Sequence, residues 1–95
     1  RDRRDGRQVV LRPWLKWPGL VLEKGIPLPA TDLRGASLPA LVAPGIQWQD
    51  SNLKGINLAG AKLNRANLSF TCLRGADLRG ANLEGAYLIG ADLEG

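Results

Sequence analysis

The hydrophobic positions of this chain recur every fifth residue from Ile26 onward. Residues 26–95 divide without insertion into 14 units of five, and the central position is Leu in 12 of them, the exceptions being Ala43 and Trp48. The position two before the centre is small or apolar, and 10 of the 12 glycines fall on multiples of five. A repeat of fixed period therefore governs most of the chain.

A period of five matches neither the 3.6-residue period of an α-helix nor the two-residue period of a flat β-strand. It suits a coil in which each unit forms one straight side and then turns a corner. The centre and the residue two before it then point inward, and the other three point outward. Glycine at the fifth position suits a corner with unusual dihedral angles. Asp or Asn between the inward pair can hydrogen-bond the local backbone.

The units ADLRG (76–80), ANLEG (81–85) and ADLEG (91–95) resemble those of the pentapeptide repeat family. The resemblance covers residues 26–95 and is most specific in the last nine or ten units. It implies an all-β fold, a right-handed four-sided β-helix (a solenoid) in which four units make a 20-residue coil. Fourteen units would form about 3.5 coils in a column roughly 17 Å long. Such solenoids are stabilised mainly by contacts between neighbouring coils.

Stacking the chain at 20 residues per coil predicts four inward columns of central residues, which we expect to form the core. Trp48 is too large for a leucine position in so narrow a column, and the preceding unit has Ala43 at its centre. We therefore expect a bulge or a widened coil at residues 41–50.

Two outward surfaces are candidate binding sites. The first is a basic stripe formed by the stacked residues Arg34, Lys54 and Arg74 and followed by Glu94. It could bind phosphate, or it could be a solvated face balanced by neighbouring acids.

The second candidate surface is an outward face with apolar residues, which are Pro27, Pro29, Phe70, Tyr87 and Ile89. Exposed apolar groups in a small domain often mark a contact, although single apolar residues are also scattered over ordinary surfaces. We expect Phe70, Tyr87 and Ile89 to contact a protein partner.

Thr31, Ser51 and Thr71 share an inward column, where we expect their hydroxyls to hydrogen-bond to the backbone or to one another. A Ser or Thr nucleophile would need a base, and the chain has no His. Cys72 stands at an outward position without a resolving cysteine, so we expect an unreactive thiol.

The composition excludes several kinds of chemistry. The chain has no His, no Met and one Cys, so we expect no disulfide, no Cys-rich zinc site and no His-based catalysis. No nucleophile–base pair or phosphate loop is visible. We therefore expect no enzyme activity, no cofactor and no metal. No apolar run approaches the roughly 18 residues of a transmembrane helix, and no signal-peptide pattern is visible.

Residues 1–25 differ from the repeats and carry the net charge. The seven bases and three acids of residues 1–24 sum to +4, which is the charge of the whole chain. We expect this basic leader to be an N-terminal capping domain with two extended segments, at about 8–12 and 20–23, around a turn. Trp14 and Trp17 in that turn either plug the first coil or anchor the chain to a membrane surface or a protein partner.

These features favour a non-catalytic protein–protein interaction or scaffold module, a piece of a larger chain or assembly with one or more protein partners. One alternative, suggested by the resemblance, is a DNA-mimic inhibitor of a DNA topoisomerase. A mimic of this length needs on the order of ten uncompensated acids, whereas residues 25–95 hold six acids and six bases. Another alternative is attachment to nucleic acid or to a membrane surface through the basic leader. Few aromatics and no recognisable nucleic-acid-binding motif make nucleic acid the weaker of these partners.

Overall fold

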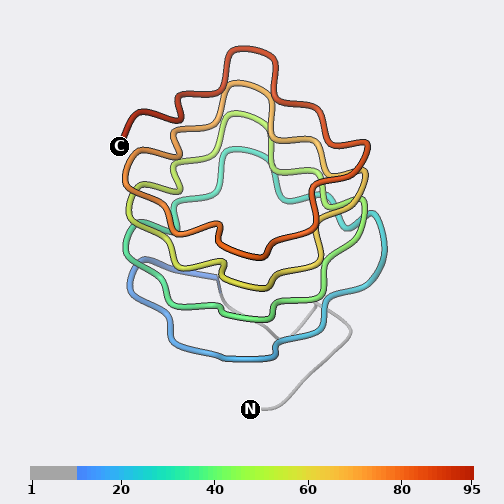
Figure 1. Cartoon of the computed structure of the whole chain (residues 1–95), viewed down its shortest axis with the longest axis vertical. Helices are drawn as coiled ribbons and strands as arrows, with labels where there is room; N and C mark the ends of the chain where they lie inside the picture. The colour runs from blue at the N-terminus through green and yellow to red at the C-terminus, as the bar shows by residue number, and fades with distance from the viewer. Residues whose placement is uncertain (1–10) are drawn as a thin grey trace.

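The computed structural model describes residues 11–95, which wind into a stack of coils (Figure 1). In each coil, bridging residues stand about five positions apart and pair in parallel with the next coil, 20 positions later from Pro27 onward. Pro27 pairs with Gln47, for example, and Asn52 with Cys72. The described residues contain no helix, and each bridge joins single residues separated by turns, so no continuous strand is formed. The expected β-structure is therefore present as isolated parallel bridges.

Backbone hydrogen bonds join each unit to its neighbours in the stack. In the unit 31–35, the Leu33 N–H donates to the Asn52 carbonyl (2.8 Å), and the Thr31 carbonyl accepts from the Asn52 N–H (2.9 Å). A bond across the corner runs from the Ala36 N–H to the Leu33 carbonyl (3.1 Å). Since most of these bonds cross between coils, each unit depends on the coils beside it.

The corners explain the spacing of the glycines. The last residue of every unit from Trp14 to Gly95 has a positive φ, in the left-handed region that glycine adopts without steric cost. Six corners nevertheless carry another residue, namely Trp14, Ala30, Ala40, Asp50, Arg65 and Phe70.

The polar residue between the two inward positions stabilises the turn, as predicted. In seven units an Asp or Asn side chain accepts a hydrogen bond from the backbone N–H two residues later. The Asn57 Oδ1, for example, accepts from the Ala59 N–H at 3.0 Å. This local bond satisfies a backbone donor on the outer surface of the coil.

Two of these carboxylates also hold an arginine two residues later. The Arg79 Nε donates to Asp77 Oδ1 at 2.9 Å, and its Nη2 donates to Asp77 Oδ2 at 2.8 Å. Arg34 holds Asp32 in the same two-bond manner. The side-chain hydrogen bond from the arginine lowers the pKa of Asp77 to about 2 and also lowers the pKa of Asp32.

These pKa shifts predict a weak acid sensitivity. A carboxyl whose pKa is lower in the folded chain stabilises the fold above its unfolded pKa of about 3.9, and this contribution is lost as the pH falls through the folded value. We expect the Tm to fall between about pH 4 and pH 2, and to fall less steeply in Asp77→Asn. Thermal melts between about pH 4 and pH 2 measure how steeply the Tm falls with pH. If the Tm of Asp77→Asn and of Asp32→Asn falls as steeply as that of the parent protein, the assignment is contradicted.

The predicted inward columns form the core. The central residues from Leu33 to Leu73 are at most 2% exposed. The central leucines of the last coil are more accessible, and Leu93 is 52% exposed. Their side chains are covered by the stack on one side only, so burial decreases toward residue 95.

Trp48 lies in the core without the predicted distortion. Its side chain is 0% exposed, and the bridges from Val42 to Lys62 and from Gln47 to Asn67 keep the 20-residue spacing. The expected bulge at 41–50 is therefore wrong. Ala43, the preceding central residue of the same coil, is smaller than leucine by about as much as Trp48 is larger, so the total volume of the pair is nearly conserved.

The coils begin before the predicted boundary at residue 25. Lys16 pairs with Ser37 and Val21 with Val42, which are 21 positions apart, so one extra residue lies between Val21 and Pro27. The extra residue offsets the five-residue repeat of the sequence by one position, but the parallel bridges between coils continue on both sides of it. The predicted boundary at residue 25 therefore does not mark a break in the stack. The predicted extended segment 20–23 supplies one bridging residue, and residues 1–10 lie outside the described part of the chain.

Within residues 11–95 the structure has no helix long and apolar enough to cross a membrane. The same residues bring together no group of three or more Cys, Asp or Glu side chains suited to a metal ion.

Candidate interaction surface

One side of the stack is almost free of charge. The units 26–30, 46–50, 66–70 and 86–90 lie in register there, joined by bridges from Pro27 to Gln47, Asn67 and Tyr87 in turn. Asp50 is the only charged residue in these four units. We call this side the uncharged face.

The exposed apolar side chains gather at one end of the uncharged face. Phe70, Tyr87 and Ile89 are 62%, 61% and 71% exposed. Tyr87 and Ile89 belong to the same unit, and the Phe70 ring lies beside it, where a Cβ on Gly90 would clash with the ring. The predicted cluster of these three residues is therefore present in the structure.

Pro27 and Pro29 do not join this cluster. They lie on the same face in its first unit, and the units 46–50 and 66–70 separate them from Tyr87 and Ile89. These intervening units present Gln, Asn and Ser between the corners. The apolar surface is consequently confined to the two units nearest the C-terminal end.

Two strained corners flank this surface. Arg65 leads into the unit 66–70 with a φ of 64°, and Phe70 leaves it with a φ of 60°. A left-handed conformation costs a non-glycine residue about 1–2 kcal/mol. The Arg65 stem leans over Gly85 as Phe70 leans over Gly90, with the Arg65 Cγ 3.4 Å from where a Gly85 Cβ would be.

Arg65 was absent from the candidates drawn from the sequence. The signal that identifies it is a large charged residue at a position where the repeat places glycine. We call Arg65, Phe70, Tyr87 and Ile89 together the corner patch. It combines three exposed apolar side chains with one cation.

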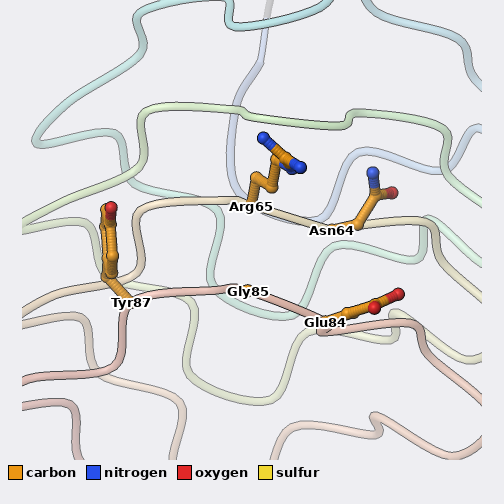
Figure 2. Close-up of a pocket in the computed structure, with 5 residues that line it drawn as sticks. All are labelled: Asn64, Arg65, Glu84, Gly85 and Tyr87. Carbon is orange, nitrogen blue, oxygen red and sulfur yellow. The ribbon is translucent and has the colours of Figure 1, made fainter.

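A hollow of about 500 Å³ lies at the Arg65 end of the corner patch (Figure 2). Gly85 lies between Tyr87 and Glu84 on the trace below Arg65, and the Arg65 and Tyr87 side chains project to the same side of the backbone. Asn64 and Glu84 line the opposite end of the hollow, and the Glu84 carboxylate points away from Arg65. Among the described residues no acid forms an ion pair with Arg65, so its guanidinium is free to bind a carboxylate.

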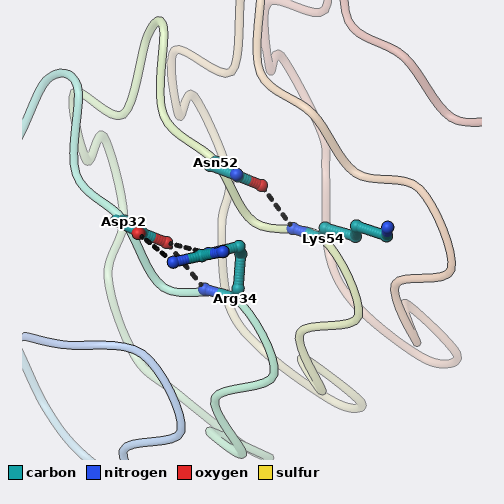
Figure 3. A network of polar contacts seen from close by, with 4 residues as sticks. All are labelled: Asp32, Arg34, Asn52 and Lys54. Atoms are coloured by element: carbon teal, nitrogen blue, oxygen red, sulfur yellow. Dashed lines mark hydrogen bonds and ion pairs between the residues drawn. The ribbon is translucent and has the colours of Figure 1, made fainter.

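The basic stripe is present, but much of its charge is neutralised. Arg34 forms an ion pair with Asp32 at 2.9 Å (Figure 3), and Arg74 lies 3.8 Å from Asp92 and 3.4 Å from Glu94. Of the three stripe residues only Lys54 has no ion pair with a described residue. A phosphate would therefore compete with the resident carboxylates for both arginines, which favours the interpretation of a solvated face.

The inward hydroxyls bind backbone carbonyls. The Thr31 Oγ1 donates to the Leu28 carbonyl at 2.7 Å, and the Thr71 Oγ1 to the Leu68 carbonyl at 2.8 Å. The Ser51 Oγ donates to the Leu28 carbonyl at 3.4 Å and accepts from the Thr31 N–H at 2.9 Å. These bonds give the hydroxyl column a structural role in the corner between two units.

The two N-terminal tryptophans lie in different environments. Trp14 occupies a corner and is 76% exposed, with its indole over Gly35, so of the two alternatives for this residue the plug of the first coil is wrong. Trp17 is partly buried and packs against the core at the position that stacks on Leu38. Trp14 also borders a hollow of about 470 Å³ with Arg34 and Lys54.

The model of a family described as pentapeptide repeats (8 copies) matches the chain over residues 49–80 and 74–95. These ranges contain all four residues of the corner patch. No curated protein matches the chain.

Proposed function

Because the chain belongs to the pentapeptide repeat family through residues 49–95, we propose that it is a non-catalytic protein-interaction module within a larger chain or assembly. The observation that carries this proposal is the gathering of Phe70, Tyr87 and Ile89 on the uncharged face, each more than half exposed. The cores of protein interfaces are depleted in charge and enriched in aromatic residues. We therefore propose that the uncharged face contacts the partner.

The bonding between coils supports this role. Tyr87 and Asn67 stand in a bridge whose N–H groups and carbonyls are fixed by the neighbouring coils, as in the 2.8 Å bond from the Leu68 N–H to the Tyr87 carbonyl. A surface held in this way loses little backbone entropy on binding. A partner would thus meet a preorganised row of side chains.

The finer description of the fold is also a proposal. We propose that the stack is a right-handed four-sided β-helix, as the family implies. Its support is the spacing of the bridges at residues 32, 37, 42 and 47, which gives four sides to each 20-residue coil. A crystal structure would decide the handedness, and a left-handed or three-sided coil would contradict the proposal.

The alternative of a DNA mimic is less well supported. Four of the six acids of the array, namely Asp32, Asp77, Asp92 and Glu94, lie in ion pairs with arginines. A mimic of the phosphate backbone needs acids whose charge is not compensated. Of the six acids of the array, Asp50 and Glu84 lie outside these pairs, in separate units.

The proposed interaction can be tested by photo-crosslinking in an extract of the native cells. The photoreactive amino acid p-benzoylphenylalanine would replace Tyr87, and in a control protein Arg79, which is exposed on another side of the stack. We expect a discrete adduct from position 87 that is lost when Ile89→Asp is added, because a buried carboxylate disfavours an apolar contact. Mass spectrometry identifies the adduct.

Two results would contradict the proposed face: equal adducts from positions 87 and 79, or recovery of the unmodified monomer alone. The variant Ile89→Asp should retain the Tm of the parent protein within about 2 °C, since exposed substitutions change stability little. A retained Tm assigns the loss of the adduct to the surface rather than to unfolding.

A further inference from the structure

We propose that the corner patch recognises an extended protein segment in which an acidic residue is followed, at alternate positions, by two apolar residues. The acid would bind Arg65, and the apolar side chains would pack on Tyr87, Ile89 and Phe70. This inference rests on the proposed function and names the chemistry of the partner.

The charge argument depends on Arg65. Arg34, Arg74 and Arg79 all lie in ion pairs, whereas Arg65 forms none with the described residues. Its planar guanidinium can bind a carboxylate through two parallel hydrogen bonds. Glu84 also lines the hollow, but its carboxylate points away from Arg65, so a partner's carboxylate can approach the guanidinium.

The backbone gives a second, independent observation. Arg65 and Phe70 adopt the left-handed conformation although they are large residues, as Trp14 does near the start of the stack, whereas the three remaining non-glycine corners carry Ala or Asp. Both side chains are exposed, so burial in the core does not offset the strain. Backbone strain without a compensating structural role is characteristic of functional positions.

The order of the side chains determines the pattern expected in the partner. From one edge of the face to the other, a segment would meet Arg65 over Gly85, then Tyr87, then Ile89, with Phe70 over Gly90 at the far edge. The positions 85, 87 and 89 are two residues apart. Alternate side chains of an extended chain lie on one side at the same spacing, so three side chains of the partner can match three positions of the patch.

A random peptide library displayed on phage and selected against the purified protein tests this inference. We expect enrichment of an Asp or Glu followed by apolar residues two and four positions later. A synthetic peptide of the enriched sequence should bind about five- to tenfold more tightly than the same peptide with Gln or Asn in place of the acid.

The variant Arg65→Gly isolates the role of the cation. It restores the residue that the repeat places at corners, so the protein should fold with an unchanged or higher Tm. We expect it to bind the acidic and the amide peptide equally. Lys54→Gln is the matched control, because it removes from another side of the stack an exposed cation that has no ion pair within residues 11–95, and it should retain the full preference.

The outcomes separate this inference from the proposed function. Selected peptides that need Tyr87 and Ile89 but show no acidic preference, or keep that preference in Arg65→Gly, would overturn the partner chemistry and leave the interaction face standing. A selection without enrichment over an unrelated bait would also overturn the inference. The photo-crosslink at position 87 decides the proposed function separately.

Discussion

Replacing Trp48 by Ala is expected to lower the free energy of unfolding by about 3–5 kcal/mol, the usual cost of truncating a buried aromatic residue. Trp48 is 0% exposed inside a narrow column, where neighbouring coils cannot collapse without breaking their ladder. Since small domains are stable by only about 5–15 kcal/mol, the variant should unfold at a much lower denaturant concentration. Chemical denaturation followed by circular dichroism measures the change.

Variants that exchange side-chain volume between positions 43 and 48 test why the truncation of Trp48 is destabilising. Ala43→Leu alone should overpack the coil and cost about 1–3 kcal/mol, and Trp48→Leu alone should leave a cavity. The double variant restores leucine at both central positions and removes the Trp48 Nε1, which is buried without a hydrogen-bond partner. We expect its stability to equal or exceed that of the parent protein.

The coupling energy of this double-mutant cycle is the decisive quantity. A positive coupling, with the double variant more stable than either single one, shows that the two residues share one volume. Additive losses would mean that Ala43 does not accommodate Trp48, and the absence of a bulge at 41–50 would then need another cause.

The second large effect is expected at a corner glycine. Gly35→Ala should cost about 2–4 kcal/mol, the sum of left-handed strain and the displacement of the Trp14 indole. A Cβ at Gly35 would overlap atoms of that indole, and the φ of Gly35 is +66°. Thermal and chemical unfolding both measure the loss.

Gly60 supplies the matched control for the strain alone. Its φ is +71°, and a Cβ there would meet nothing within 4 Å, so Gly60→Ala should cost about 1–2 kcal/mol. Adding Trp14→Gly to Gly35→Ala should reduce its cost to that of Gly60→Ala. Equal costs for the two single variants would show that the indole moves aside freely and that the dihedral angle alone requires glycine.

The comparison of Gly35 with Arg65 shows which features the five-residue repeat predicts and which it does not. The five-residue spacing correctly identified the corners, the inward leucines and the turn-stabilising Asp and Asn side chains, because each depends on the local conformation of one unit. It did not identify Arg65 as a site residue, since a departure from glycine is recognised as strain only when the dihedral angle is known. The three-residue apolar cluster was predictable because residues 20 apart stack directly.

The prediction for Trp48 was wrong for a different reason. The sequence shows that the residue is large, but whether the coil widens depends on the space left by its neighbours. The extra residue between Val21 and Pro27 likewise interrupts the sequence phase, whereas the backbone absorbs it and keeps the ladder intact. Both outcomes are decided by packing between units that the linear pattern treats as independent.

The ion pairs illustrate the same distinction. The basic stripe of Arg34, Lys54 and Arg74 followed from the 20-residue period, but its charge depends on which acids reach the guanidinium groups. The structure shows Asp32 on Arg34, and Asp92 and Glu94 on Arg74, while Arg65 forms no ion pair with any of residues 11–95. That Arg65 lies beyond the reach of these acids is thus decided by three-dimensional geometry.

The sequence alone determined the repeat, the inward columns and the side of the stack on which Phe70, Tyr87 and Ile89 gather, because a strict period turns sequence spacing directly into spatial register. Only the tertiary structure decided that Trp48 fits, that the stack begins before residue 25, and that Arg65 leans over Gly85 beside Tyr87. These features depend on volume, dihedral angle and side-chain reach between coils, which are properties of contacts rather than of positions in the chain.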